Sequence, residues 1–391
     1  MNMIHRSPQT AGGSRAGLSV TMLGLRGFPN VQGGVERHVE NLARELSSLG
    51  CNVEAVLRSP YVSKDVGSNW QGIRLYRLWS PRIKGLEPFV HSFLGVLRAA
   101  WTRPDILHIH GIGPAFFTPL GRMLGLKVVV THHMANYENE KWSRLACAIL
   151  KLGERSGMVL SHGRIAVSPS LAERMRRTYH VGVRAIPNGI NAPLRLQSPS
   201  ILQTFGLTPG RYLLTVARID PQKRQLDLIA AFARLGRPDW KLVLVGGSDY
   251  RSDYSRAVEE AARATAGVVL LGARSGSVLA ALYTSAGAFV LPSSHEGQPI
   301  AVLEALSYGC PVVLSDIPAH REIQASAARY FTPGDVDALT DQLRATCEDR
   351  LERTSDETER ARIIKAHDWR NIAAETLAVY DAALRNSDGA E

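Results

Sequence analysis

Two glutamates stand eight positions apart in residues 292–306, on either side of a turn that leads from an apolar strand into a helix. Glu296 lies in the turn. Glu304 lies in the helix, roughly 7.5 Å along its axis from Pro299, which is expected near the first helical position. Ionised carboxylates only accept hydrogen bonds, so each suits paired hydroxyl groups. We interpret Glu296 as a partner for sugar hydroxyls and Glu304 as a partner for a ribose diol, since apolar neighbours of Glu304 argue against two solvated side chains.

The same turn is expected to bind an anion or a partly negative sugar oxygen. The first N–H groups of a helix have no partner within it, and the helix dipole favours negative charge at that end. The residues expected to form this sugar-binding loop are Gly297, Gln298, Pro299 and Ile300.

Two cations follow another expected strand, at residues 212–216. Arg218 and Lys223 would neutralise a diphosphate, because a guanidinium group forks onto two oxygens and an ammonium group acts as a point charge. A departing nucleoside diphosphate needs such stabilisation. An exposed ion-paired surface would explain the two residues as well, so the sequence leaves both interpretations open.

The first half of the chain supplies a scaffold of alternating strands and helices. An apolar run at 18–24 precedes the pair Gly33 and Gly34, where a helix begins whose apolar residues recur at spacings near 3.6 until Gly50. The further strands expected in this half lie at 53–57, 106–109, 127–131 and 164–168. Helical stretches between these strands predict βα units and a parallel sheet.

The second half repeats this alternation after a linker expected at 191–199, which is rich in Pro, Ser and Gln. Its expected strands lie at 212–216, 241–245, 268–271, 289–291 and 312–314. We therefore predict an α/β chain with a flexible leader at 1–17 and two doubly wound, Rossmann-like domains at 18–190 and 200–370. Ligands of such sheets bind at the carboxyl ends of strands, which makes the cleft between the domains the default site. A final helix at about 371–384 is a candidate to pack back on the first domain.

Charge is unevenly distributed along the 391 residues. Residues 1–190 hold 24 Lys and Arg against 11 Asp and Glu, a net charge of +13, whereas residues 191–391 hold 22 against 25, a net charge of −3. The basic half predicts an anionic partner, such as nucleic acid, an acidic membrane surface or a phosphorylated substrate. A merely solvated basic surface is the alternative.

Targeting and cysteine patterns favour a cytoplasmic protein. Residues 1–17 lack the apolar stretch of a secretory signal. The most apolar long window, 112–131, contains Arg122 and Lys127 and so fails as a membrane span. The four cysteines lie far apart and form no metal-binding or disulfide pattern, which fits a reducing compartment.

The joint spacing of these motifs resembles the retaining glycosyltransferases of glycosyltransferase family 4, which have the GT-B fold. The likeness runs from Gly24 to Ile323 and includes the two glutamates, the two cations and the glycine pair. It implies a nucleoside diphosphate sugar as donor, with Glu296 contacting its sugar and Glu304 its ribose. It also implies transfer of a hexose or deoxyhexose with retention of anomeric configuration.

The resemblance assigns roles to further residues. Arg218 and Lys223 would bind the pyrophosphate, and Gly33 and Gly34 would approach the phosphates from the first domain. Arg274 would lie where the family's backbone contacts the base. His110, which would otherwise be read as a structural histidine at a strand end, matches a family histidine near the reacting sugar and joins Glu296 as a catalytic candidate. Residues 136–142 and 295–304 are most similar to bacterial polysaccharide enzymes, including rhamnosyltransferase-like members.

No metal and no other cofactor is expected. The triplet Asp335-Val336-Asp337 spells the DxD by which other sugar transferases bind a metal. It follows Pro333-Gly334 and precedes a helix, so capping explains it better. No other carboxylate cluster has metal-site spacing, and Arg218 and Lys223 can replace the cation.

Basic and aromatic residues alternate between positions 74 and 103, which bears on the acceptor. Six basic residues face one acid, Glu87; they are Arg74, Arg77, Arg82, Lys84, Arg98 and Arg103. The aromatic residues are Tyr76, Trp79, Phe89, Phe93 and Trp101. This pattern predicts peripheral contact with anionic lipid on the cytoplasmic membrane face, where a lipid-linked saccharide would be presented as acceptor. The helical spacing of Phe89, Val90, Phe93, Leu94 and Leu97 also predicts that this face packs on the first sheet.

Three other classes of protein were weighed. A dinucleotide-dependent oxidoreductase is disfavoured, because residues 24–29 do not spell GxGxxG and Pro29 disrupts the helix start. A sugar-nucleotide epimerase or a phosphorylase would share the architecture, and fold alone does not separate these chemistries. A basic nucleic-acid-binding protein would fit the charge, but no recognised motif accompanies it, so no nucleic-acid partner is expected.

Overall fold

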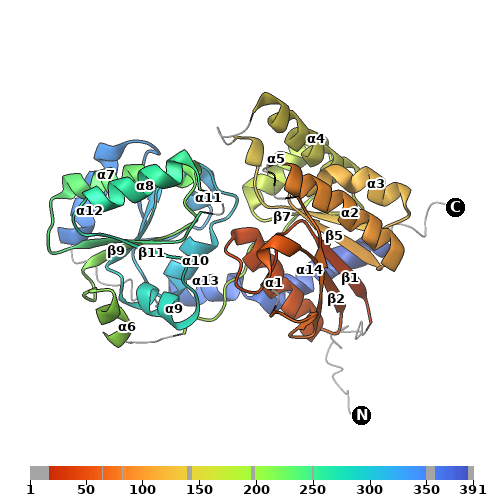
Figure 1. Cartoon of the computed structure of the whole chain (residues 1–391), viewed down its shortest axis with the longest axis horizontal. Helices are drawn as coiled ribbons and strands as arrows, with labels where there is room; N and C mark the ends of the chain where they lie inside the picture. Colours follow the sequence, from red (N-terminus) through yellow and green to blue (C-terminus); the bar gives the residue numbers. More distant parts are fainter. Residues whose placement is uncertain are drawn as a thin grey trace, which may run out of the picture.

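The computed structural model describes residues 17–63, 65–81, 83, 85–138, 143–194, 199–248, 251–348 and 357–385. These residues form two α/β lobes, each built around a largely parallel sheet (Figure 1). The predicted fold class of two Rossmann-like α/β domains is confirmed. None of the helices in the described ranges has both the length and the apolarity to cross a membrane.

The first sheet has eight strands in the order β3-β4-β2-β1-β5-β6-β7-β8, and only the β3–β4 pair is antiparallel. Its strands are β1 (Ser19–Leu23), β2 (Asn52–Arg58), β3 (Asn69–Trp70), β4 (Ile73–Leu78), β5 (Ile106–His110), β6 (Val128–His132), β7 (Gly163–Ala166) and β8 (Arg184–Ala185). Side chains alternate between its faces: Val20 and Met22 of β1 join one core, and Leu23 joins the other.

Helices cover both faces of this sheet. One face is covered by α1 (Gly34–Ser48) and α14 (Trp369–Arg385). The other is covered by α2 (Leu86–Thr102), α3 (Thr118–Met123), α4 (Arg144–Leu160) and α5 (Pro169–Tyr179). Short 3-10 turns lie at η1 (Ser59–Tyr61), η2 (Pro114–Phe117) and η3 (Asn136–Glu138).

The second sheet has six strands in the order β11-β10-β9-β12-β13-β14, all parallel. They are β9 (Tyr212–Val216), β10 (Lys241–Val245), β11 (Val268–Gly272), β12 (Ala288–Leu291), β13 (Val312–Ser315) and β14 (Arg329–Phe331). One core includes residues from or beside α6 (Pro199–Thr204), α9 (Gly276–Ser285), α10 (Ile300–Ser307) and α13 (Glu357–Ala366). The other includes α7 (Gln225–Leu235), α8 (Asp253–Ala264) and α12 (Val336–Glu348). The turn η4 (Pro221–Lys223) and the short helix α11 (Pro318–Arg321) complete this lobe.

The last helix of the described chain belongs to the first lobe. Trp369, Ile372 and Tyr380 of α14 are buried in the same core as α1 and β1. The Tyr380 hydroxyl lies 2.7 Å from Nδ1 of His108 on β5. In Figure 1 this helix lies beside α1 in the first lobe, although the residues before it in the sequence belong to the second lobe.

Helix α2 meets the sheet with a different face than the sequence predicted. Gly95 lies so close to β1 that a Cβ there would stand 2.3 Å from Cδ1 of Leu23. The buried side of α2 therefore consists of Glu87, His91, Ser92, Gly95, Val96 and Ala99, not of its aromatic stripe. Phe89 is 37%, Phe93 40% and Leu97 40% exposed, so the prediction that these three pack on the sheet is wrong, whereas Val90 and Leu94 are half-buried.

Candidate active site

The chemical residues of the second domain gather at the carboxyl ends of two neighbouring strands. β9 and β12 pair in parallel, so the segments that follow them emerge at the same edge of the sheet. Arg218 and Lys223 follow β9, and the loop with Glu296 follows β12. That loop ends at Pro299, which is the N-cap of α10, so Pro299 directly precedes the first helical residue.

Glu296 and Lys223 form a buried ion pair in this loop. The Lys223 ammonium donates to the Glu296 carboxylate, and the Ser293 hydroxyl donates to the same Oε1 at 2.7 Å. Burial by itself would raise the pKa of Glu296, but the adjacent Lys223 charge and its hydrogen bond bring the net pKa below the ordinary value of 4.5. Glu296 is therefore ionised at neutral pH, and each charge has a partner.

Glu304 is paired with the other domain. Its Oε1 lies 2.5 Å from Nη2 of Arg37 on α1, and the Tyr283 hydroxyl donates to its Oε2 at 3.1 Å. Burial raises the pKa of Glu304, and Arg37 only partly opposes that shift. Arg37 was missed by the sequence analysis. Its position one turn after the glycine pair, on the helix expected to face the donor, is the signal that could have found it.

The start of α1 points toward the second domain. Oε1 of Gln32 accepts from the backbone N–H of Gly247, beyond β10, at 3.0 Å. Gly33 is the N-cap of α1, and a Cβ there would lie 1.9 Å from Oε2 of Glu36, which is ion-paired with Arg26. A Cβ on Gly34 would meet nothing within 4 Å. The backbone at Gly34 is therefore open to a bound group, whereas Gly33 is required by its own surroundings.

The predicted sugar-binding loop is held from the first domain at two points. The backbone N–H of Asn188 donates to the side-chain oxygen of Gln298, and Asn188 Nδ2 donates to the Gln298 carbonyl at 2.9 Å. A Cβ on Gly297 would lie only 1.7 Å from the carbonyl oxygen of His133. Ile300 is buried in the core of the second domain. The loop's position thus depends on contacts across the domain boundary.

We expect Gly297→Ala to impair transfer because the new methyl group would push the Glu296 loop away from His133. Displacements near 1 Å at a site can lower activity by about 10²-fold. Steady-state kinetics would measure this loss in kcat/KM. Gly182→Ala is the matched control, since nothing lies within 4 Å of a Cβ there. Equal activity of the two variants would contradict the close approach.

The two remaining nucleotide-binding candidates differ in position. Arg218 is half-buried directly after β9, and its carbonyl accepts from Gln225 Nε2 at 2.8 Å. Arg274 follows β11, the edge strand farthest from β14, and its exposed guanidinium stands 5.8 Å from the Phe205 ring. The structure therefore joins Glu296 directly with Lys223 but gives Arg274 a separate position.

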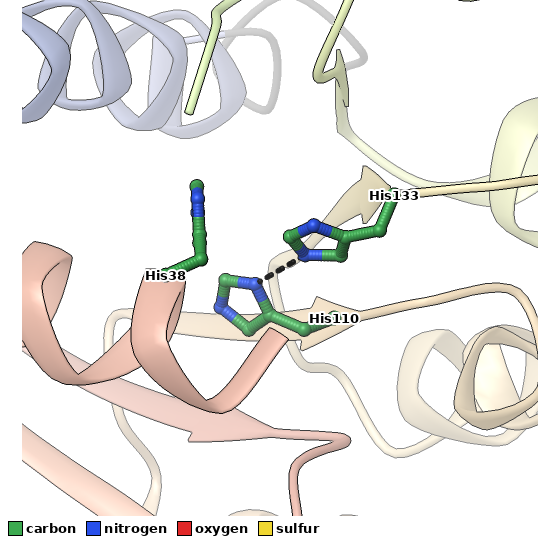
Figure 2. Close-up of side chains that lie close together, drawn as sticks. All are labelled: His38, His110 and His133. Atoms are coloured by element: carbon green, nitrogen blue, oxygen red, sulfur yellow. Dashed lines mark hydrogen bonds between the residues drawn. The ribbon is translucent and has the colours of Figure 1, made fainter. Parts of the chain in front are cut away.

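His110 lies at the end of β5 in a cluster of three imidazoles, of which His38 and His110 are buried and His133 is half-buried (Figure 2). Its Nδ1 is 3.3 Å from Nε2 of His133, which directly follows β6, and the ring of His38 on α1 stands 5.6 Å away. Burial lowers the pKa of His38 to about 4 and holds the pKa values of His110 and His133 well below 6.5. All three rings are neutral at pH 7. The sequence analysis missed His38, because a single histidine on an amphipathic helix gives no signal.

The DxD triplet caps a helix, as its context predicted. Oδ1 of Asp335 accepts from the backbone N–H of Ala338 at 2.9 Å in the first turn of α12. Asp337 pairs with Arg234 on the surface. These contacts support the capping interpretation.

Two family models match successive parts of the chain. The model described as Glycosyltransferase Family 4 matches residues 32–192, and the model described as Glycosyl transferases group 1 matches residues 203–367. Together they contain both glutamates, both cations, the glycine pair and His110. The chain belongs to glycosyltransferase family 4. It is an enzyme of the nucleotide-sugar glycosyltransferase type.

Relatives of this glycosyltransferase match it along most of its length. A GDP-mannose:cellobiosyl-diphosphopolyprenol alpha-mannosyltransferase from Xanthomonas campestris is 25% identical and covers 92% of this chain and 96% of its own. A phosphatidyl-myo-inositol mannosyltransferase from Mycobacterium leprae is 27% identical, with 90% and 94% covered.

Solved structures share the fold of this glycosyltransferase. Sucrose-phosphate synthase from Thermosynechococcus elongatus superposes with a TM-score of 0.81 at 22% identity, and 94% of this chain and 99% of that one are covered. HepE from Anabaena, in complex with UDP, gives a TM-score of 0.70 at 19% identity, with 92% and 99% covered. At these identities the likeness establishes the GT-B architecture alone.

Proposed function

We propose that this glycosyltransferase moves a hexose or deoxyhexose from a nucleoside diphosphate sugar to a lipid-linked saccharide, with retention and without a metal ion. The observation that carries the proposal is the buried Glu296–Lys223 pair at the carboxyl ends of β9 and β12. At this edge of the sheet an ammonium group and an ionised carboxylate lie side by side. In the proposal, the ammonium group binds the diphosphate of the donor and the carboxylate binds its sugar. The product has its place in bacterial polysaccharide assembly.

In this proposal the cation side of the site binds the pyrophosphate. Lys223 and Arg218 neutralise the charge that grows on the diphosphate as the glycosidic bond breaks. The free N–H groups at the start of α1, beside the open position Gly34, approach the same phosphates from the first domain. Arg274 contributes to base binding from beyond β11.

The carboxylates bind the two sugars of the donor. Glu304 accepts from the ribose diol, and for this its Oε1 must exchange Arg37 for the ligand. Glu296 accepts from the donor-sugar hydroxyls, and its negative charge stabilises positive charge that develops on the reacting carbon. Loop residues 297–300 carry this carboxylate into position. Neutral His110 faces the reacting sugar from the first domain and can accept a hydrogen bond there.

The lipid-linked acceptor is supported by the relatives. The Xanthomonas enzyme is named for a diphosphopolyprenol acceptor, and the Mycobacterium enzyme for a phosphatidylinositol. Both names describe a head group tethered to lipid. The donor of this chain stays open between UDP-glucose, GDP-mannose and dTDP-rhamnose.

A donor screen tests the reaction. Each nucleotide sugar is supplied with polyprenyl-diphosphate-linked oligosaccharides, and release of the nucleoside diphosphate is measured in excess chelator. We expect acceptor-dependent release to persist, and the product linkage, read by NMR, to keep the donor's anomeric configuration. Loss of activity that magnesium or manganese restores would refute metal independence. Donor conversion without an acceptor would favour an epimerase.

The surface of the first domain supports access to a membrane. The outward side of α2 carries the exposed stripe of Phe89, Phe93 and Leu97, and α4 carries another at Leu145, Ile149 and Leu152. The turn η2 packs between these helices: Phe89 contacts the rings of Phe116 and Phe117, and a Cβ on Gly153 of α4 would lie 3.3 Å from the Phe116 backbone nitrogen. The two stripes therefore belong to one side of the domain. Trp79 and Trp101 are 64% and 88% exposed.

The charges beside this surface are partly paired. Arg98 forms two hydrogen bonds with the Glu54 carboxylate and stacks on Tyr76, and Arg74 lies 3.9 Å from the same carboxylate. Glu54 thus neutralises part of the positive charge of this surface, although it lies outside residues 74–103, in which the acidic and basic residues were counted. Arg82 and Lys84 lie outside the described residues. We propose that apolar insertion and the remaining cations together hold the protein on anionic lipid.

Sedimentation with vesicles tests this contact. We expect the protein to pellet with anionic but not neutral vesicles, and less at high salt because screening tightens. The double variant Arg82→Glu/Lys84→Glu should bind at least tenfold more weakly, since each charge contributes about 1 kcal/mol near the surface. Phe93→Ser/Trp101→Ser should weaken binding through lost insertion.

The matched control is Arg256→Glu/Arg263→Glu, which makes the same charge change on α8 of the second domain. It should bind vesicles like the wild type. Protein that stays in the supernatant with anionic vesicles at low salt would refute the membrane contact. If both charge-reversal variants lose the same amount of vesicle binding, the binding depends on the net charge of the protein and not on the α2 surface.

A further inference from the structure

Three histidines from separate elements of the first domain converge at its boundary with the second. His38 comes from α1, His110 from the end of β5 and His133 from the residue after β6 (Figure 2). One ring nitrogen of each lies within 4.8 Å of one ring nitrogen of each other residue. The three ring centroids are 4.8 to 5.6 Å apart.

From this convergence we propose that His38, His110 and His133 form a binding site for a divalent transition-metal ion, of which Zn²⁺ is the best match. Imidazole nitrogen is a preferred ligand of zinc, copper and nickel, whereas magnesium and manganese prefer oxygen. Three protein ligands with a fourth position open to water are a known zinc arrangement. This ion is separate from the metal-free transfer chemistry proposed above.

The spacing fits a tetrahedral ion. With Zn–N bonds of about 2.0–2.1 Å, two ligand nitrogens of a tetrahedral site stand roughly 3.3 Å apart. His110 Nδ1 and His133 Nε2 are already 3.3 Å apart. The His38 ligand nitrogen lies within 4.8 Å of the other two, so an approach of at most about 1.5 Å completes the set, which rotation of its ring can supply.

The surrounding hydrogen bonds also favour a ligand role. Nδ1 of His38 lies 2.9 Å from Oδ1 of Asn188, and the Asn188 amide nitrogen donates elsewhere, so its oxygen accepts from His38. That bond fixes the His38 tautomer and leaves Nε2 with a free lone pair, as in the outer contacts of metal-bound histidines.

The ionisation state is compatible with binding. Burial keeps the pKa values of all three rings below their ordinary value, so each is neutral at pH 7 and offers a lone pair. The neighbouring histidines are engaged otherwise: His108 contacts Tyr380 and Thr131, and His132 contacts Glu154. The three-histidine set is therefore distinct from the two beside it.

Cobalt and zinc titrations test the site directly. Full-length protein, stripped with chelator, is titrated with Co²⁺ and followed by visible absorption, and with Zn²⁺ by calorimetry. We expect one ion per chain and the intense visible bands of four-coordinate cobalt. His38→Gln and His133→Gln should each weaken binding at least 100-fold, and Asn188→Ala by about 10- to 100-fold. His180→Asn, at an exposed position with left-handed backbone, is the control and should bind normally.

Circular dichroism and the unsupplemented melting temperature show whether each variant folds. If folded His38→Gln and His133→Gln bind zinc as tightly as the wild type, or if the wild type shows no saturable binding at micromolar zinc, the proposal is overturned. Magnesium should not compete, and competition by magnesium would also overturn it.

One consequence rests on the proposed function. An ion held beside His110 would occupy the space of the reacting sugar, so micromolar zinc should inhibit transfer, and chelator should restore it. His38→Gln should require at least 100-fold more zinc for inhibition. If the enzyme binds zinc but zinc does not inhibit transfer, only this consequence is wrong. If the enzyme shows no transfer in metal-free buffer, that result counts against the proposed function, and the zinc-binding result is unaffected.

Discussion

Glu296→Gln should fold normally and lose at least 10²-fold in kcat. The substitution preserves size and keeps an oxygen for the Ser293 hydroxyl, but it removes the negative charge that the proposal places beside the reacting carbon. Loss of a single electrostatic contact that strengthens in the transition state has an effect of this size. Single-turnover kinetics at saturating donor would measure it.

Nucleotide binding separates this expectation from general damage. In Glu296→Gln the Lys223 ammonium loses its ionic partner and becomes more available to a diphosphate, so the affinity for the nucleoside diphosphate should be kept or increased. Glu173→Gln, which removes a half-exposed charge on α5, is the matched control. Near wild-type turnover in Glu296→Gln would remove this residue from the reacting site.

Lys223→Ala should weaken donor binding and lower kcat together, each by a factor of ten or more. The diphosphate gains charge as the bond breaks, so the lost cation matters more in the transition state than in the bound donor. The variant also leaves buried Glu296 without the group that lowers its pKa, so that pKa should rise. When the pH is lowered, the residual activity of the variant should therefore disappear at a higher pH than the activity of the wild type.

The direction of this shift in the acidic limit of activity follows from the Glu296–Lys223 ion pair. In the wild type, Lys223 holds the pKa of Glu296 below 4.5, so the charged carboxylate persists until the solution is more acidic than that. Lys223→Arg retains the charge and should recover part of the rate and the wild-type pH limit. Lys365→Ala, a cation removed from the exposed side of α13, controls for net charge. An unchanged rate of Lys223→Ala at saturating donor would exclude the cation from transfer.

Strands with continuous apolar runs could be predicted from the sequence, including the edge strand β11, whereas short or polar strands could not. The apolar runs at 212–216 and 241–245 coincide with β9 and β10, because strands buried on both faces need continuous hydrophobic residues. β3, β4, β8 and β14 were not predicted. They lie at or next to the sheet edges, where short length or polar residues weaken the pattern, as in the sequence IRLYRL of β4.

Contacts between motifs of the same sheet were also more predictable than contacts between the domains. Lys223 and Glu296 follow adjacent buried strands, so their meeting follows from a parallel sheet. The Arg37–Glu304 and Asn188–Gln298 contacts join residues of different domains, and no local periodicity encodes them. The α2 error has the same origin: helical spacing shows that Phe89, Phe93 and Leu97 share a side, but Gly95 decides which side meets the sheet.

The return of α14 to the first lobe has a consequence for synthesis on the ribosome. Its Tyr380 bonds a histidine 272 positions earlier, and its Trp369 lies against Gly189. The amino-terminal lobe therefore cannot complete its core while the second lobe is still being translated, although its own strands have already emerged. The second lobe has all of its strands by Phe331 and its last core helix by Ala366, so its core can be completed before α14 is made. Chaperone dependence and proteolysis of nascent chains should accordingly concentrate on the lobe that is made first and finished last.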